Sequence, residues 1–285
     1  MGIVNRTPDS FYDGGAYLDD RAAEAHVRAL CAEGADILDL GAESTRPGAP
    51  RIEAALQMER IGTLLEFAVA QGVTVSIDTT DPVVAEWALR GGARMVNSVS
   101  LAAASELGAL AARFGAELVL MHCRGSMTAM AGFSCYPDDA YDDVVADVAR
   151  EWQEAAGHAL REGVAPEKLL LDPGLGFTKN AAQSLALCAR LGELRALGHP
   201  ILVGTSRKSF VAHACAAALH GPAPRPVDRL GGSIMAAVWC AAAGASVLRV
   251  HDVAATRQAI ALADQLGAAA GSGGKSVARA LVGEG

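Results

Sequence analysis

Short apolar runs rich in β-branched residues recur along the chain, and each ends in polar side chains. Successive runs begin more than twenty residues apart, which leaves room for a crossover helix between them. The eight runs lie at residues 2–5, 36–41, 73–78, 94–98, 117–123, 169–174, 200–206 and 246–252. Strands that alternate with helices form parallel βαβ units, and eight units predict a closed (β/α)8 TIM barrel. A doubly wound open sheet is the alternative.

Two of the intervening segments carry helix signals at their ends. Residues 140–163 place apolar side chains at helical spacing and end in Gly163, which can stop the helix. A second segment, 81–92, opens with Asp81 as a cap and Pro82 at the first helical position. These signals support helices between the strands.

Length and composition agree with a single barrel domain. The chain has 285 residues, of which 51% are hydrophobic and 31 are glycine, as expected for an α/β protein with many tight connections. We expect a barrel over residues 1–267 that starts with a short strand. The Gly-, Ala- and Ser-rich residues 268–285 are predicted to form a flexible C-terminal tail.

Several classes of protein are disfavoured by the composition. The chain has no run of eighteen apolar residues and no signal-peptide pattern at its start. Its six cysteines are scattered without a C-x-x-C pair, which predicts free thiols in a reducing compartment. A formal net charge of −8 argues against a general nucleic-acid binder, although an anionic small substrate remains compatible. We therefore expect a cytoplasmic protein that acts on small molecules.

Polar residues follow nearly every predicted strand. In a (β/α)8 barrel the active site lies at the C-terminal ends of the strands, so these residues are the candidates. They are Asn5, Asp13, Thr45, Arg46, Asp78, Asn97, His122, Arg124, Asp172, Lys208, Ser209, Arg249 and His251. A single residue of this kind is usually a cap or a solvated loop residue. A full ring of them is more difficult to explain in that way.

Four of the candidates suit a flat, hydrogen-bonding heterocycle. Asp78 and Asp172 can accept from an amino-pyrimidine, Asn97 can donate and accept, and Lys208 can donate to a carbonyl or ring nitrogen. The alternative is that the two aspartates only cap the turns that follow them. Asp172 opens the turn sequence Asp-Pro-Gly, which favours that alternative for this residue.

A second group suits a phosphate. Arg249 and His251 stand two apart on a predicted strand and therefore face the same side, which Asn5 also approaches. A basic pair at the mouth of a barrel can bind a phosphate group. The alternative is that Arg249 forms a salt bridge with an inward-facing carboxylate.

A third group lies at the start of a predicted helix. The segment 204–210, Gly-Thr-Ser-Arg-Lys-Ser-Phe, places Ser206 or Ser209 near the helix cap, with Arg207 and Lys208 alongside. Free N–H groups at a helix N-terminus attract anions, so this segment predicts a phosphate or carboxylate site.

Two polar loops follow the first two strands. They span residues 5–17 and 41–51 and exceed the usual length of a βα connection. Such loops either connect elements at the surface or close over an active site, and we expect closure here.

In this order, the motifs resemble those of the dihydropteroate synthases. The matching blocks are MGIVNRTPDSFYDGG, GAESTRPGA, SIDTTDP, LMHCRG, LLLDPGLGFTKN, LVGTSRKSF and LRVHDVAAT, from Gly2 to about Gly267. The resemblance implies a transferase of folate biosynthesis that joins 6-hydroxymethyl-7,8-dihydropterin diphosphate to 4-aminobenzoate. The products are 7,8-dihydropteroate and diphosphate. It also implies a bound Mg²⁺ and a homodimer.

The resemblance further implies a role for individual residues. The residues that would hold the pterin are Asp78, Asn97, Asp172 and Lys208, with Arg249 packed on it and reaching the diphosphate together with His251. Asn5 would ligate Mg²⁺. Phe177 and Ser209 would line the aminobenzoate pocket. Thr45 and Arg46 would bring the second loop over the site, and Asp13, in the first loop with Asp9 and Phe11, would stabilise developing positive charge.

The stretch Met95 to Ser100, MVNSVS, departs from the usual pattern of this family. Asn-Asp is usual there, whereas Asn97-Ser98 is more typical of the methyltransferases that pass a methyl group from methyltetrahydrofolate to a corrinoid protein. The remaining motifs favour the synthase, because the methyltransferase has no use for a diphosphate site. Ser98 alternates to the other face of the strand, away from the ligand.

Arg6 is a second departure, since the family more often has a small apolar residue at that position. Arginine there also occurs in synthase-like paralogues suspected of lacking activity, which tend to lose the Ser-Thr-Arg-Pro segment that this chain keeps. The alternatives are therefore a pterin-binding paralogue without catalysis and a corrinoid-dependent methyltransferase.

Overall fold

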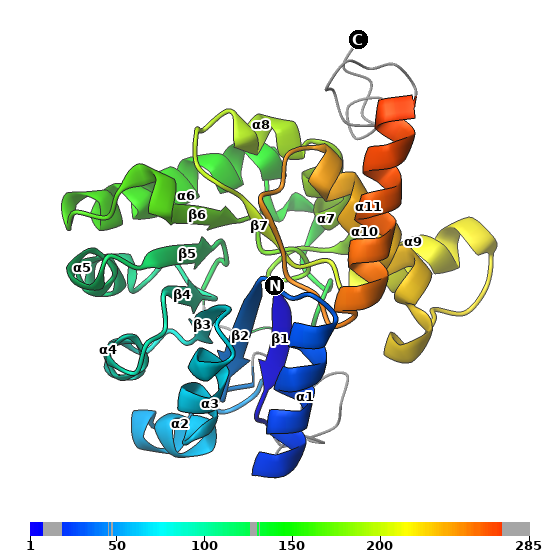
Figure 1. Ribbon diagram of the computed structural model, residues 1–285. Helices are drawn as coiled ribbons and strands as arrows, with labels where there is room; N and C mark the ends of the chain where they lie inside the picture. Colours follow the sequence, from blue (N-terminus) through cyan, green and yellow to red (C-terminus); the bar gives the residue numbers. More distant parts are fainter. Residues whose placement is uncertain (8–18, 45, 47, 126–129, 131, 270–285) are drawn as a thin grey trace.

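A ring of eight parallel strands forms the centre of the computed structural model, which describes residues 1–7, 19–44, 46, 48–125, 130 and 132–269 (Figure 1). The strands are β1 (Gly2–Asn5), β2 (Ile37–Gly41), β3 (Thr74–Asp78), β4 (Met95–Ser98), β5 (Glu117–Met121), β6 (Leu169–Asp172), β7 (Leu202–Val203) and β8 (Val247–Leu248). Each of the eight predicted runs contains one of them. The short first strand is confirmed, and β7 and β8 are shorter still.

Isolated bridges close the ring. Strands β1 to β6 pair in sequence order, and β7 pairs with β8. A bridge between Leu171 and Ile201 joins β6 to the residue just before β7, and a bridge between Gly2 and Val250 joins β1 to the segment that follows β8. At the second junction the Ile3 N–H donates to the Val250 carbonyl at 3.1 Å. The predicted closed barrel is therefore confirmed, and the open sheet is wrong.

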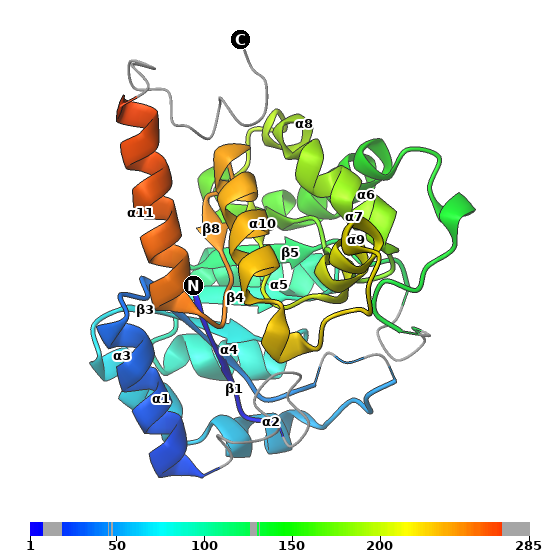
Figure 2. The same cartoon turned by 90° about the vertical axis from the view of Figure 1, so that its right-hand side faces the viewer.

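Helices surround the strands on the outside of the barrel (Figures 1 and 2). They are α1 (Asp20–Ala32), α2 (Ala54–Ile61), α3 (Leu64–Ala70), α4 (Pro82–Arg90), α5 (Ala104–Phe114), α6 (Val144–Arg161), α7 (Ala181–Ala189), α8 (Leu191–Arg195), α9 (Ser209–Leu219), α10 (Leu230–Ala242) and α11 (Val253–Ala269). In the part of the chain that the structure describes, short 3-10 turns lie at η2 (Asp138–Ala140), η3 (Pro166–Lys168) and η4 (Pro226–Asp228). Among the described residues, none of the helices combines the length and the apolar character needed to cross a bilayer.

The predicted helix ends are confirmed. Asp81 caps α4 by accepting from the Val83 N–H at 2.8 Å, and Pro82 takes the first helical position. Helix α6 buries Trp152 completely, and Gly163 stands just beyond its end with φ +98°. Helix α11 extends to Ala269, so residues 268 and 269 of the predicted tail are helical, and the rest of the tail, 270–285, lies outside the described residues.

The barrel interior changes from apolar to polar along the strands. Its lower layer is the buried cluster of Met1, Met95, Val119, Leu170 and Leu202, with Ile37 and Val247 packed against it. Successive inward-facing residues are two apart on a strand, so the next layer comes two residues later. That layer contains Ile3, Asp39, Asn97, Met121, Asp172, Gly204 and Arg249. The same alternation that fills the core therefore carries the polar residues to the C-terminal end of the barrel.

Gly108 allows α5 and α6 to pack closely, and we expect its replacement by valine to destabilise the protein. A Cβ at residue 108 would lie 2.8 Å from the Cα of Ala159, so the two helices would have to separate. The expected loss in the free energy of unfolding is about 1–3 kcal/mol, measured by urea denaturation. Gly157→Ala on α6 is the matched control, because its Cβ would meet only the Arg161 side chain, at 3.4 Å. The control is expected to be neutral or stabilising, and equal losses in both variants would contradict the packing argument.

Candidate active site

A cavity opens above the polar layer, at the C-terminal ends of the strands. Nine of the predicted site residues line it: Asn5, Asp78, Asn97, Asp172, Phe177, Lys208, Ser209, Arg249 and His251. They come from strands β1, β3, β4 and β6 and from the segments that follow β6, β7 and β8. The structure therefore brings the heterocycle group, the phosphate group and the start of α9 to one place.

The residues predicted to act from the two loops, Asp13, Thr45 and Arg46, cannot be placed with that group. Asp13 and Thr45 lie outside the described residues, as do Asp9 and Phe11. Arg46 is described but does not line the cavity; its N–H donates to the Ser44 hydroxyl at 3.4 Å. Their roles remain predictions.

Asp39 is the functional residue that the sequence reasoning missed. It is fully buried beneath the cavity, where its Oδ2 accepts from Asn97 Nδ2 at 3.0 Å and from Arg249 Nε at 2.6 Å. The first contact leaves Asn97 Oδ1 for a ligand. The signal in the sequence was an aspartate inside an apolar strand, two residues after an inward-facing isoleucine.

Arg249 forms salt bridges with two inward-facing carboxylates. Besides Asp39, its Nη2 lies 2.8 Å from Asp78 Oδ2. The alternative held open for Arg249 is therefore confirmed in this structure. Its guanidinium still lines the cavity, so it can stack on a planar ligand and donate to an anion on the same side.

Burial raises the pKa values of the two carboxyls in the pocket. It raises the pKa of Asp78 to about 7, although Arg249 opposes the shift. It also raises the pKa of Asp172, which Lys208 opposes. Asp172 Oδ1 accepts from the Gly174 N–H at 2.8 Å, so the predicted turn cap is present as well. Both residues nevertheless line the cavity.

Lys208 and His251 carry less positive charge in the pocket than the sequence suggested. Burial lowers the pKa of Lys208 to about 8, with Asp172 opposing. Burial and the charge of Arg249 lower the pKa of His251 to about 3. The predicted basic pair is therefore one cation beside a neutral imidazole. His251 Nδ1 lies 2.9 Å from the hydroxyl of Ser206, another cavity residue that sequence reasoning did not select as a ligand.

The second half of the cavity is aromatic and ends at the start of α9. Phe177 meets Phe133 edge to face with ring centroids 5.4 Å apart, and Lys208 Nζ lies 4.5 Å from the Phe177 centroid. No side chain caps the N-terminus of α9 within the described residues, so its first N–H groups are available to an anion. The Ser209 hydroxyl lies 2.7 Å from that of Ser134.

Arg207 does not belong to this anion site, contrary to the expectation. It adopts φ +57° and turns away to form a salt bridge with Asp252 at 2.6 Å. Its Nη1 donates to the carbonyls of Pro226 and Val227, both at 3.0 Å. It therefore anchors the segment around η4, and Lys208 is the cation of this segment that faces the cavity.

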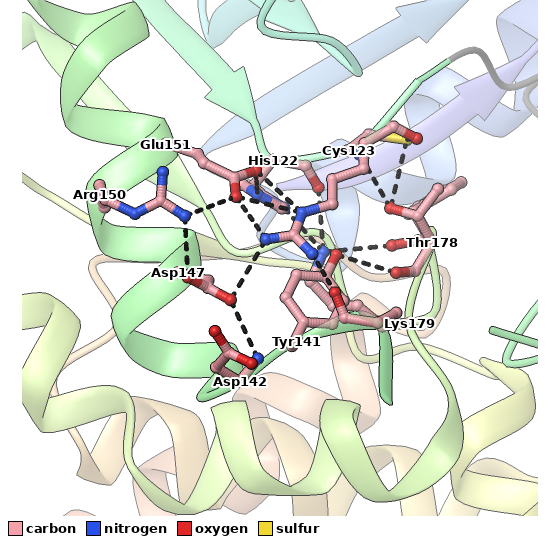
Figure 3. A network of polar contacts seen from close by, with 12 residues as sticks. His122, Cys123, Tyr141, Asp142, Asp147, Arg150, Glu151, Thr178 and Lys179 are labelled. Carbon is pink, nitrogen blue, oxygen red and sulfur yellow. Dashed lines mark hydrogen bonds and ion pairs between the residues drawn. The ribbon is translucent and has the colours of Figure 1, made fainter. Parts of the chain in front are cut away.

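His122 and Arg124 also leave the predicted ring. Neither lines the cavity; both contact Glu151 of α6 on the outer side of the barrel (Figure 3). The inclusion of these two residues among the candidates at the mouth was wrong. They belong to a separate polar network that links helix α6 to the β6–α7 connection.

The two departures in the sequence lie outside the cavity. Ser98 is buried and donates its hydroxyl to the Ser100 carbonyl at 2.9 Å, which supports the expected orientation away from the ligand. Arg6 forms a salt bridge with Asp20, at the start of α1, at 2.7 Å. Neither change removes a residue that lines the pocket.

Asn5 is the one predicted metal ligand. No group of three or more acidic, histidine or cysteine side chains able to hold a metal occurs within the described part of the chain. Asn5 lines the cavity with its amide, an oxygen donor of the kind that Mg²⁺ accepts. Because Mg²⁺ usually takes one or two protein ligands together with substrate phosphates and water, a single asparagine fits an ion that arrives with a diphosphate.

This chain is similar to known proteins in sequence and in fold. A family profile described as pterin binding enzyme matches residues 1–251. The dihydropteroate synthase of Mycobacterium leprae is 42% identical over 91% of this chain and 90% of its own length, and that of Escherichia coli K12 is 40% identical over 91% and 88%.

Solved structures agree with the sequence relatives. Dihydropteroate synthase of Xanthomonas albilineans with 4-aminobenzoic acid superposes with a TM-score of 0.82 at 39% identity, covering 94% of this chain and 92% of that one. The same enzyme in complex with 7,8-dihydropteroate gives a TM-score of 0.79 at 37% identity over 94% and 93%. The chain therefore belongs to the pterin-binding enzymes, and within them to the dihydropteroate synthases.

Proposed function

We propose that the protein condenses 6-hydroxymethyl-7,8-dihydropterin diphosphate with 4-aminobenzoate to give 7,8-dihydropteroate and diphosphate, as a dihydropteroate synthase of folate biosynthesis. The observation that carries the proposal is the composition of the cavity. Donors and acceptors for an amino-pyrimidine stand on the strands, and an aromatic wall with an uncapped helix N-terminus stands beside them. The relatives that match over most of their length are named dihydropteroate synthases, and two of the solved structures are of such enzymes with 4-aminobenzoic acid and with 7,8-dihydropteroate as ligands.

The pterin would lie on the polar layer. Asp172 and Asn97 would accept from its N–H groups, and Lys208 would donate to its carbonyl or ring nitrogen. The raised pKa of Asp78 keeps part of that carboxyl protonated near neutral pH, so it can also donate. Arg249, fixed by Asp39 and Asp78, would stack on the ring and direct one edge toward the diphosphate.

Bond cleavage would begin with the departure of diphosphate. The C–O bond of the methylene breaks, its electron pair goes to the diphosphate oxygen, and a pterin methylene cation remains. Arg249 would stabilise the growing negative charge, and His251 would add a neutral N–H donor. Bound Mg²⁺, held by Asn5 and the substrate, would supply further charge neutralisation.

The amine would then capture the cation. The nitrogen of 4-aminobenzoate attacks the methylene carbon and afterwards loses a proton to solvent. Phe177 would stack along the ring of this substrate, and its carboxylate would lie at the start of α9 beside Ser209. The second loop, with Thr45 and Arg46, would exclude water, and Asp13 would stabilise the cation.

Two further features support a proposal about the assembly and the location of the enzyme. An apolar groove between α7, α9 and α10 is lined by Leu185, Phe210, Val211, Met235 and Trp239, with Leu185 and Met235 more than 40% exposed. This face suits a second copy of the chain, and we propose a homodimer. All six cysteines are free, which fits the cytoplasm as the place where the enzyme acts.

The first test is the release of diphosphate by the purified protein. We expect release that requires both Mg²⁺ and 4-aminobenzoate, with formation of dihydropteroate in equal amount. Binding of the pterin diphosphate by calorimetry without release would instead indicate a pterin-binding paralogue. Binding of methyltetrahydrofolate without any response to aminobenzoate would indicate a corrinoid-dependent methyltransferase.

A further inference from the structure

Lys179 is buried behind the active site and is not used in the reaction described above. It lies in the connection between β6 and α7, and its side chain has no solvent exposure. Its Nζ contacts three acceptors: His122 Nδ1 at 3.0 Å, the His122 carbonyl at 3.2 Å and the Phe177 carbonyl at 3.2 Å. Burial lowers the pKa of Lys179 to about 7, so the ammonium and amine forms both occur near neutral pH. The ammonium form has three N–H donors, and these three acceptors match it completely. Lysine is rarely buried in full, and such a complete set of partners indicates a specific task.

A chain of polar contacts links this lysine to helix α6 (Figure 3). The second ring nitrogen of His122, Nε2, lies 3.0 Å from Glu151 Oε2. Arg124 holds the same carboxylate through two nitrogens, with Nε at 3.1 Å and Nη2 at 2.5 Å from Oε1. Burial and the charge of Lys179 lower the pKa of His122 to about 3, so the imidazole is neutral. It donates to Glu151 and accepts from Lys179, and it thereby connects α6 to the β6–α7 connection.

That connection is held in an unusual backbone conformation. Gly174 adopts φ +68° and packs against the His122 carbonyl so closely that a Cβ would overlap with it. Thr178 adopts φ +45°, which is uncommon for a β-branched residue. The Tyr141 hydroxyl donates to the Thr178 carbonyl at 3.0 Å, and the Arg124 N–H donates to the Thr178 hydroxyl, also at 3.0 Å. Such a conformation persists only where its surroundings enforce it.

The same connection shapes the cavity in two ways. The Phe177 ring forms the aromatic wall, and the carbonyl that Lys179 binds belongs to the same residue. The Leu175 carbonyl accepts from Lys208 Nζ at 2.8 Å. The pterin-facing Asp78, Asn97 and Asp172, in contrast, stand on strands that the barrel itself fixes. A disturbance at Lys179 therefore reaches Phe177 first, Lys208 only through the Leu175 carbonyl, and the three strand-borne pterin residues least.

We propose that Lys179, supported by His122 and Glu151, is a positioning residue that holds Phe177 in place for the second substrate, 4-aminobenzoate. The inference rests on the proposed function. It extends that function to residues outside the cavity, because Glu151 of helix α6 would help to set the shape of the aminobenzoate pocket.

The test replaces Lys179 with methionine, which keeps the length of the side chain and removes its donors. We expect the KM for 4-aminobenzoate to rise about 10- to 100-fold while the KM for the pterin diphosphate stays within about 3-fold. Lys168→Met is the matched control, because Lys168 also donates to a backbone carbonyl, that of Gly115, but lies next to the start of β6, at the other end of the barrel. The control is expected to leave both KM values unchanged. Unchanged KM values in Lys179→Met, or equal rises for both substrates, would overturn the proposal.

A second pair of variants covers the case in which Lys179→Met does not fold. Glu151 is partly exposed, and Glu151→Gln removes its charge while keeping a hydrogen-bonding side chain for His122. We expect a rise in the KM for aminobenzoate of about 3- to 10-fold, whereas exposed Glu154→Gln on the same helix has no effect. An equal response of the two glutamate variants would count against the proposal. Wild-type turnover in the same assay tests the proposed function separately, because an inactive wild-type protein would reject that function and not the role of Lys179.

Discussion

Replacing Arg249 with methionine is expected to lower kcat/KM for the pterin diphosphate by about 100- to 1,000-fold. Arg249 is the permanent cation among the described residues that line the cavity, and it is aimed by Asp39 and Asp78. Its removal takes away a donor that would act on the leaving diphosphate as charge develops, where a preorganised group has its largest effect. The variant also leaves two buried carboxylates without their partner. Turnover should therefore fall through kcat as well as through KM.

The same variant should lose stability in a pH-dependent way. Burial raises the pKa of Asp78 to about 7, so the folded protein binds more protons than the unfolded chain between about pH 4 and pH 7. The free energy of unfolding therefore decreases as the pH rises through that range. Without Arg249 the pKa rises further, and the decrease continues above pH 7. We expect the variant to be less stable than the wild type by about 3–5 kcal/mol at pH 8, and by less at pH 6, in urea denaturation.

Arg257→Met is the control for both effects. Arg257 is exposed on α11 and donates to the Gly34 carbonyl at 2.6 Å, at the opposite end of the barrel from the cavity. Its loss should leave turnover unchanged and stability nearly so. If Arg249→Met kept wild-type kcat, the guanidinium would be a structural counter-ion for Asp39 and Asp78 and not a group that acts on the diphosphate.

The barrel could be predicted from the sequence because its signals are local and repeated. Each strand is an apolar run with a polar end, and the caps at Asp81 and Gly163 follow from residue type alone. The heterocycle group could also be predicted, because Asn97 and Asp172 stand at strand ends that parallel topology brings together. The alternation of two then places both side chains inside the barrel.

What could not be predicted depends on contacts between distant segments. Nothing in the local sequence distinguishes Asp39 from the other aspartates. Its role depends on the fold, which places its Oδ2 2.6 Å from Nε of Arg249, 210 residues later in the chain. His122 occupies a strand end like the others, but its ring faces α6 because Glu151 offers a partner there. Arg207 and Lys208 are neighbours of the same charge, and only the left-handed backbone at Arg207 and the position of Asp252 send them in opposite directions. Residue type and spacing carry none of this information.

Asp172→Asn is expected to stabilise the protein while removing most of its activity. Burial raises the pKa of Asp172, so its ionised form is disfavoured in the fold at neutral pH. The asparagine has no such charge, and its Oδ1 can still accept from the Gly174 N–H, which Asp172 does at 2.8 Å. We expect a higher melting temperature than that of the wild type at pH 8, and a gain that becomes smaller as the pH falls and the wild-type carboxyl takes up a proton.

The loss of activity in Asp172→Asn has two causes. The amide offers one acceptor in place of two oxygens and points N–H groups at the N–H donors of the pterin, so kcat/KM should fall about 100-fold. The carboxylate also raises the pKa of Lys208 against the effect of burial, and its removal should lower that pKa below about 8. Lys208 would then be mostly neutral at pH 8 and a poorer donor to the pterin. The activity of the variant should accordingly decline more steeply than that of the wild type between pH 7 and pH 8.5.

An exposed aspartate provides the comparison for Asp172→Asn. Asp228 forms a salt bridge with Arg225 at 2.8 Å on the surface near η4, and Asp228→Asn should change neither the melting temperature at pH 8 nor kcat/KM by a measurable amount. A fall in both stability and activity of Asp172→Asn would mean that the carboxylate is needed to hold the turn after β6. A gain in stability with a loss of turnover would mean that the buried charge of Asp172 serves pterin binding and lowers the free energy of unfolding.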